Sequence, residues 1–417
     1  MNKILLMTVM IILIIGLVAC SNSKPQVPET TEPIKPTEST PETTAPEESE
    51  PMNKNDLSAA ILDMSYADAK KNTMFSPLSL DMAIALVAEG AENKECFSRF
   101  LGQSNYSEYA EKYFSRMEYL NQDARFSYMN YKTLFEIANA VYVDNKYMIQ
   151  DKYLEATAKY SAETKTLDFS DKALSVDTIN KWAAEKTHDM IPAIIQESNL
   201  SDDTMMLALN AIYFESPWSK PWIVGNPSDF TLFDGSKSNV PMIQSKNKLY
   251  YENDKAIAFG SRYINGFVFI GILPKTEGEF NVQDLDIDSL LESESTDYVV
   301  NSTMPKFKFE NTTGNLMNYL TMLGYGEMFE ENALPYIASM GNENALLNIS
   351  GIIQADAIEL DENGTKAAAV TAIMVETTGV IETPPEEKTV ILDRPFAFLI
   401  YDPEMEQIIF MGKVVSL

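Results

Sequence analysis

One stretch near the C-terminal end, residues 362–393, constrains the fold more than any other because its first half favours two structures at once. Its run of three alanines at 367–369 favours a helix, whereas the β-branched residues that follow, as far as Val375, favour a strand. Both tendencies can be used by one chain, so the stretch is a candidate for a segment that changes its structure.

Read as a strand, this stretch presents one face that carries no charge. Alternate residues of a strand point to the same side of its sheet. The two charges between 365 and 376, Lys366 and Glu376, fall on the opposite side, so burying the first face would not bury an ion. The first face is small or apolar throughout and consists of Thr365, Ala367, Ala369, Thr371, Ile373 and Val375.

Beyond this face the residue types become those of an exposed extended loop. Gly379 is followed by Pro384 and Pro385 and then by Glu386 and Glu387, which suit a loop better than a strand. Two interpretations follow from the residues. The first is a strand and a surface loop ahead of a final hairpin, and the second is a bait loop that enters a sheet after being cut.

Several segments around this stretch together resemble one protein family. The run G-T-K-A-A-A-V-T-A at 364–372 is preceded by E-L-D-E-N and followed by D-R-P-F-A-F-L-I and I-I-F-M-G-K-V-V. These segments resemble the hinge, the reactive loop and the C-terminus of a serpin, a family that inhibits serine and sometimes cysteine proteases by a suicide mechanism. The resemblance implies an α+β fold, the serpin fold, with three β-sheets, about eight to nine helices and an exposed reactive-centre loop.

The resemblance also implies a hinge and a scissile bond. The implied hinge residues are Glu362, Gly364, Thr365, Ala367, Ala368, Ala369 and Thr371. In the family the cut lies about fourteen residues after the hinge glycine, which gives Thr378–Gly379 within one or two residues. Between Ala367 and Glu387 there is no Lys, Arg, Phe, Tyr or Trp to anchor a trypsin-like or chymotrypsin-like pocket. The expected partners are therefore serine proteases whose pockets take small or β-branched residues, such as elastase-like or subtilisin-like enzymes.

Other segments resemble the parts of a serpin that control the opening of its large sheet A. The segment F-S-P-L-S-L at 75–80 resembles the start of a helix beneath this sheet, with Ser76 or Ser79 as its cap and Pro77 in its first turn. The helical run at 178–187 resembles helix F, which lies across the sheet. By the same resemblance, Ser76, Ser79, Asn210 and Gln354 belong to a polar cluster under the opening, Trp218 lies at its top, and Lys306 and Glu362 form an ion pair at its mouth.

Three residues depart from the common serpin pattern. Gln354 replaces a histidine, but an amide both donates and accepts hydrogen bonds, so the polar cluster can be satisfied differently. Lys366 replaces the usual glutamate and Val370 a common alanine, both on the outward face. Because none of them puts a charge or a proline on the inserting face, inhibition is the expected activity. A non-inhibitory serpin-fold protein, acting as a chaperone or binding module, is the alternative.

The N-terminal residues are typical of an exported lipoprotein. Residues 1–19 hold an apolar run of about fifteen residues, which is shorter than a membrane span and suits a signal peptide. The run L-V-A-C ending at Cys20 looks like a bacterial lipobox, in which this cysteine is lipidated; an ordinary signal or a short anchor is the alternative. Residues 20–52, rich in Pro, Thr, Glu and Ser, indicate a disordered tether ahead of one domain at 53–417. The expected location is the outer face of a bacterial membrane, by lipid anchor, or the exterior by secretion.

The charge and the histidine and cysteine counts exclude several functions. A formal charge of −29 repels nucleic acid and anionic lipid and argues against a polyanion cofactor such as heparin. The chain has one histidine, His188, at the end of a helical pattern. An exported hydrolase with a Ser-His-Asp or Cys-His site would have to use this residue. A solute-binding lipoprotein also fits the N-terminus, but it too would have His188 as its one histidine. If Cys20 is lipidated, Cys96 is alone, which excludes a disulfide and a cysteine zinc site. With the serpin resemblance, the expectation is a monomer that is not an enzyme and needs neither cofactor nor metal.

Overall fold

The structure is a computed structural model that describes residues 52–122, 133–366 and 385–417. Residues 51–417 form one unit. Within the described residues, no helix is both long enough and apolar enough to span a bilayer.

The helices begin where the sequence supplies caps. Ser76 caps α2 by accepting a hydrogen bond from the Ser79 backbone N–H, and Pro77 is the first helical residue, as predicted. Every residue of α2 is buried, which makes it the central helix of the fold. The α-helices are α1 (Lys54–Ala69), α2 (Pro77–Ala88), α3 (Glu95–Leu101), α4 (Tyr106–Gln122), α6 (Asp151–Ala158), α7 (Lys172–Lys186), α8 (Ile287–Glu292) and α9 (Leu316–Leu320).

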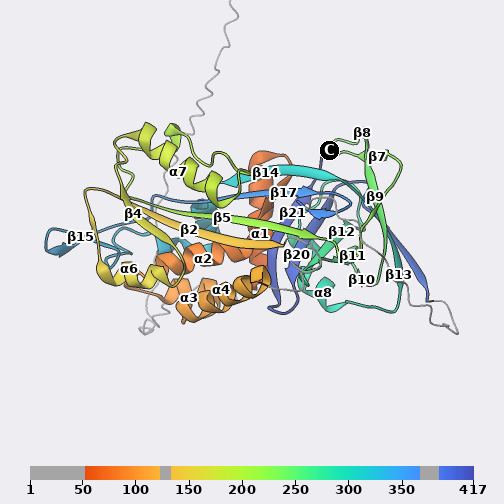
Figure 1. The fold of residues 1–417 in the computed structure, drawn as a ribbon, viewed down its shortest axis with the longest axis horizontal. Coiled ribbons are helices and arrows are strands. Elements are labelled where there is room, and N and C mark those ends of the chain that lie inside the picture. The colour runs from red at the N-terminus through yellow and green to blue at the C-terminus, as the bar shows by residue number, and fades with distance from the viewer. Residues whose placement is uncertain (1–51, 123–132, 367–384) are drawn as a thin grey trace, which may run out of the picture. The chain divides into compact units, whose positions relative to one another are not determined.

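The largest sheet around the hinge, here called sheet A, lies between α2 and α7 (Figure 1). Its strand order is β14 (Phe307–Thr313), β17 (Gly351–Leu360), β18 (Gly364–Thr365), β5 (Met206–Pro217), β2 (Leu134–Asp144) and β4 (Glu163–Leu167). β5 is buried along its whole length because helices cover both faces of the sheet.

Two further large sheets lie in the described part of the chain. Sheet B has the order β1 (Thr73–Phe75), β21 (Gln407–Val414), β20 (Phe396–Asp402), β12 (Val268–Pro274), β11 (Ala256–Arg262) and β10 (Leu249–Glu252). Sheet C has the order β19 (Glu387–Ile391), β13 (Val299–Pro305), β9 (Met242–Asn247) and β6 (Ile223–Val224). Two small sheets are formed by β16 (Glu343–Asn344), β15 (Ala338–Met340) and β3 (Met148–Ile149), and by β7 (Ser228–Thr231) and β8 (Lys237–Val240). The predicted α+β class is confirmed.

One boundary differs from the sequence-based expectation. Glu387, which was assigned to the exposed loop, is the first residue of β19 and pairs in parallel with Val299 of β13. The strand can begin on a glutamate because this side chain remains exposed and accepts a hydrogen bond from Asn301 Nδ2 at 3.0 Å. Tertiary pairing therefore overrides the low strand preference of the residue.

Sheet A separates two apolar clusters. Even-numbered residues of β5 and β17, such as Ala208 and Ile358, face α2 and sheet B in the larger cluster. Odd-numbered residues, such as Leu209 and Ile353, pack against Trp182 and its neighbours on α7. We call these the inner and the outer face of sheet A. A side chain that enters this sheet therefore meets a packed interior on the inner face.

Candidate functional site

The candidate site is a fork in the middle of sheet A. β17 and β5 pair directly and in parallel from Gly351 opposite Leu207 to Ala355 opposite Ala211. Beyond that last pair the two strands part, and β18 lies between them. We call the region from the last pair to β18 the fork. The hinge predicted from the sequence thus already contributes two residues to the sheet.

Gly364 passes very close to the backbone of β5. It pairs with Pro217 at a φ of 153°, and a Cβ placed on it would lie 2.3 Å from the Ser216 carbonyl oxygen and 2.7 Å from Pro217 Cα. Both of these are backbone atoms, which cannot turn aside as a flexible side chain can. Glycine is therefore required at this point for the hinge to enter the sheet.

The next two residues alternate between the faces of the sheet as predicted. Thr365 is 2 % exposed, and its hydroxyl lies 2.6 Å from that of the buried Tyr263. Burial raises the Tyr263 pKa, so this phenol stays protonated. Lys366 lies on the outer face with its Nζ 4.8 Å from the centre of the Tyr213 ring. The charge thus stays on the side that the sequence pattern assigned to it.

The top of the fork is tied to the end of β5. The backbone N–H of Trp218 donates to Asn363 O at 2.9 Å, and its indole Nε1 donates to Asp361 O at 2.9 Å. The Trp218 ring stacks on Tyr263 with 4.3 Å between centroids. Trp218 therefore lies at the top of the opening, where the resemblance placed it, and holds the chain that leads into the hinge.

Lys306 and Glu362 form an ion pair at the mouth of the fork. Burial acts to raise the Glu362 pKa, but the hydrogen bond and the charge of Lys306, together with a hydrogen bond from the Glu362 backbone, outweigh it and hold the pKa below its usual value. Both side chains are partly exposed, at 29 % and 26 %, so the pair contributes at most about 1 kcal/mol to stability.

The polar cluster under the fork contains all four residues that were predicted for it. Gln354 Nε2 donates to Ser76 O at 2.9 Å, and Asn210 Nδ2 donates to Asn139 Oδ1 at 2.7 Å. All of them are buried, and Gln354 pairs directly with Asn210 across β17 and β5. Within the described residues, Gln354 Oε1, Asn210 Oδ1 and Ser79 Oγ have no hydrogen-bond partner. The sequence predicted that the Gln354 amide would both donate and accept hydrogen bonds in this cluster. Its Nε2 does donate, but its Oε1 accepts no hydrogen bond from the described residues.

Sequence reasoning missed three residues of this site. Asn139 accepts the Asn210 hydrogen bond, Tyr263 receives the hinge threonine, and Asp356 lies buried on the inner face of β17. Asn139 and Asp356 had a detectable signal, because each is a polar residue between apolar neighbours, in I-A-N-A-V and A-D-A-I. Tyr263 had none, since its role depends on a contact between residues far apart in the chain.

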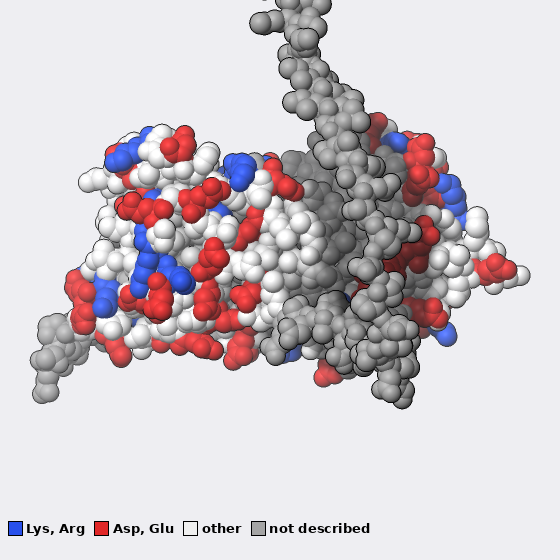
Figure 2. Space-filling model, turned by 180° about the vertical axis from the view of Figure 1, so that it is seen from behind, with Lys and Arg blue, Asp and Glu red and all other residues white. Residues whose placement is uncertain are grey.

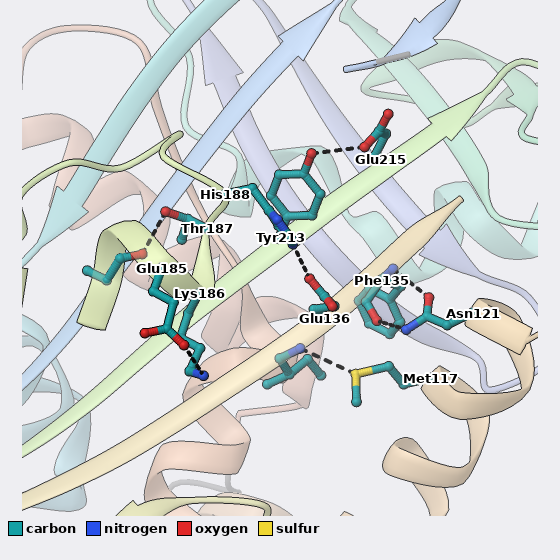
Figure 3. A network of polar contacts seen from close by, with 12 residues as sticks. Met117, Asn121, Phe135, Glu136, Glu185, Lys186, Thr187, His188, Tyr213 and Glu215 are labelled. Atoms are coloured by element: carbon teal, nitrogen blue, oxygen red, sulfur yellow. Dashed lines mark hydrogen bonds and ion pairs between the residues drawn. The ribbon is translucent and has the colours of Figure 1, made fainter. Parts of the chain in front are cut away.

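His188 joins the end of α7 to sheet A through Glu136 of β2 (Figure 3). It follows the helix at a φ of 51°, and its Nε2 lies 2.5 Å from Glu136 Oε2 on β2. Its ring lies 4.5 Å from that of Tyr213, whose hydroxyl donates to Glu215 Oε2 at 3.0 Å (Figure 3). These contacts agree with the predicted surface histidine near the end of a helix.

In the described part of the chain, no group of three or more His, Cys, Asp or Glu side chains is placed to bind a metal ion. Cys96 is buried, and burial raises the pKa of its thiol.

Figure 2 shows acidic side chains spread over the visible face, with fewer basic ones among them. Ala367, Ala368, Ala369, Thr371, Thr378, Gly379 and Cys20 lie outside the described residues.

Comparison with known proteins agrees with this geometry. The family model for serpins, described as serine protease inhibitors, matches residues 52–417. An uncharacterized serpin-like protein of Methanosarcina acetivorans is 31% identical over 358 residues, which cover 83% of this chain and 82% of the relative. Iripin-2 of Ixodes ricinus is 27% identical over 366 residues, which cover 84% and 88%.

Solved structures give the same match. The native state of tengpin, a thermophilic serpin, matches with a TM-score of 0.73 at 28% identity over 87% of this chain and 93% of that one. Serpin48 of Tenebrio molitor, described as highly specific, matches with a TM-score of 0.72 at 25% identity, over 87% and 98%.

Proposed function

Because the chain belongs to the serpin family, we propose that it is a suicide inhibitor of serine proteases and not itself an enzyme. The observation that carries this proposal is the fork, in which Gly364 and Thr365 already lie between β17 and β5. A sheet that admits two residues of the hinge can also admit the residues that follow, once a cut frees them, because the face that they would bury carries no charge.

The first step is that of an ordinary substrate. The protease nucleophile attacks the carbonyl carbon of Thr378, the bond to Gly379 breaks, and the amine of Gly379 leaves with the C-terminal part of the chain. The chain up to Thr378 then remains attached to the protease as an acyl-enzyme.

The registers at the fork define where the freed residues would go. Thr365 lies opposite Leu360 of β17 and opposite Ser216 of β5, antiparallel to both. Continuing both ladders places Thr371 between Gln354 and Asn210, which at present pair with each other. The agreement of the two registers at this pair supports insertion along the same seam.

Thr371 would bring a hydroxyl to a place that lacks a donor. In the uncut protein, Gln354 Oε1 and Asn210 Oδ1 are buried acceptors without a partner among the described residues. A threonine hydroxyl donates one hydrogen bond, so its arrival would satisfy one of the two. A buried unsatisfied polar atom costs about 1–3 kcal/mol, which insertion would in part recover.

We expect Thr371→Val, which keeps the shape and removes the hydroxyl, to lower the fraction of encounters that end in a covalent complex by about threefold to tenfold. The measurement is the ratio of trapped to cleaved inhibitor on a denaturing gel. The control is Ile373→Val on the same face, which removes a methyl group but no hydrogen bond. Equal yields from Thr371→Val and the unchanged protein would show that no donor is needed at the seam.

Insertion explains how the protease would be stopped. Residues 365–378 as a strand at about 3.3 Å each span roughly 46 Å, which carries the attached protease along the length of sheet A. Deacylation needs sub-ångström placement of the oxyanion hole and of the catalytic groups, so distortion of the trapped enzyme halts it. The uncut fold is then a kinetically trapped state.

The loop residues define the class of protease. Val375, Thr377, Thr378 and Val380 are small or β-branched and suit elastase-like or subtilisin-like pockets.

We also propose export of the chain by residues 1–19, lipidation of Cys20, a tether over residues 20–52, and a monomeric domain over residues 53–417. The tether would hold the bait away from the membrane at up to about 3.1 Å per residue.

The test is incubation of the purified protein with an elastase and with a subtilisin, followed by a denaturing gel and mass spectrometry. A heat-resistant covalent adduct with a released peptide that begins at Gly379 supports both the function and the bond. Complete cleavage in the loop without an adduct would instead identify a non-inhibitory binding or chaperone protein of the serpin fold.

A further inference from the structure

Asp356 is a buried acid at the fork that has no bonding partner. It lies on the inner face of β17 with 0 % exposure, one residue beyond the last direct pair, Ala355 with Ala211. Neither of its carboxylate oxygens has a hydrogen-bond partner among the described residues. An unpaired buried carboxylate is among the most costly groups that a fold can contain.

The neighbours that could donate to Asp356 are engaged elsewhere. Asn311 of β14 lies opposite Asp356 in the sheet. Its Nδ2 donates to Met74 O and to Thr313 Oγ1, both at 2.9 Å. Gln354, two residues away on the same face, gives its Nε2 to Ser76 O. The nearest polar side chains on these strands therefore leave the carboxyl unsatisfied.

The charged groups on the elements around β17 point away or are paired. Lys308 and Glu310 of β14 lie exposed on the outer face. Tyr213 and Glu215 of β5 are buried, but they also belong to the outer face, and Lys366 follows β18 on that same face. On the inner side, Asp81 of α2 is paired with Lys54 at 2.5 Å and accepts from Tyr109 at 2.8 Å, and Tyr319 of α9 donates to Asp68. Burial alone raises the Asp356 pKa well above its usual value, so the group is held as the neutral acid.

We propose that Asp356 makes the opening of sheet A depend on pH: the neutral acid lets the fork stay closed, and its ionisation favours opening, which brings water to the carboxylate. The part that concerns loop insertion rests on the proposed inhibitory function. The part that concerns the uncut protein does not, because a closed and an opened fork exist whether or not a protease is present.

The sign of the effect follows from the raised pKa. In an unfolded or opened chain Asp356 titrates near the ordinary value of 3.8, whereas in the closed sheet it keeps its proton to a much higher pH. Between these two values the opened state binds fewer protons, so the closed state loses stability as the pH rises through that window. Each pH unit in the window changes the ratio of the two states by up to about tenfold.

The experiment follows opening of the uncut protein by tryptophan fluorescence, since Trp218 lies at the top of the fork. The unfolding rate at one moderate denaturant concentration is measured from about pH 5 to about pH 8 for the unchanged protein, Asp356→Asn and Asp356→Ala. We expect the rate of the unchanged protein to rise at least about tenfold more than the rates of the variants. Glu359→Gln, which removes an exposed carboxylate that is paired with Lys308 on the outer face of the same strand, is the control and should follow the unchanged protein.

Two results would overturn the proposal. One is a pH profile that is the same in both Asp356 variants and in the unchanged protein. The other is an infrared spectrum of the unchanged protein near neutral pH without the band of a protonated carboxylic acid, which tests the assignment even if the variants fail to fold. A protein that shows the expected profile but never traps a protease would refute the inhibitory function alone.

Discussion

Cutting the loop at the proposed bond should raise the melting temperature of the protein by at least about 10 °C. In the uncut protein β17 and β5 pair directly only between residues 351 and 355 of β17, and the hinge fills two positions above them. Insertion would give a complete central strand. About thirteen new residues at roughly 1 kcal/mol of net hydrogen bonding each exceed what the melting shift requires, before any apolar burial is counted.

The measurement compares thermal melts, by circular dichroism, of the uncut protein and of protein clipped in the loop by a protease that is then removed. A sample incubated with the inactivated protease is the control for handling. If clipped and uncut protein melt at the same temperature, no energy is stored in the uncut fold, and the proposed trapping mechanism has no driving force.

Local patterns in the sequence were sufficient to predict much of the fold around the hinge. The start of α2 depends on a serine cap and a proline that are adjacent in the chain, and both act within one turn. The alternation of Thr365 and Lys366 depends only on the period of a strand. Such features need no knowledge of distant residues, which is why they could be predicted.

Contacts between distant segments could not be predicted in the same way. Whether the hinge is already in the sheet depends on the space between β17 and β5, which no local pattern specifies. Gln354 Oε1 lacks a hydrogen-bond donor because none of the described side chains that α2 and β5 place near it donates to it. Counting donors and acceptors requires the packed structure, so sequence reasoning assumed a satisfied cluster where the structure leaves acceptors unpaired.

Thr365→Arg should convert the proposed inhibitor into a substrate. Thr365 is 2 % exposed and bonded to Tyr263 on the inner face, so an arginine at this position would bury its guanidinium against the apolar cluster. Burying an unpaired charge there costs several kcal/mol, so the hinge should leave the sheet and the cut loop should no longer insert. We expect the yield of covalent complex to fall at least about tenfold, while cleavage of the loop continues.

Lys366→Arg is the matched control because it introduces the same side chain one residue later, on the outer face that already holds a cation above Tyr213. A fold disturbed by arginine in general would affect both variants, whereas an effect of the inner face would affect only Thr365→Arg. The measurement is the ratio of complex to cleaved product at equal protease, with a melt of each uncut variant to verify folding. If Thr365→Arg traps protease as well as Lys366→Arg does, the inner face of the hinge does not have to be buried, and insertion at the fork cannot be the step that stops the protease.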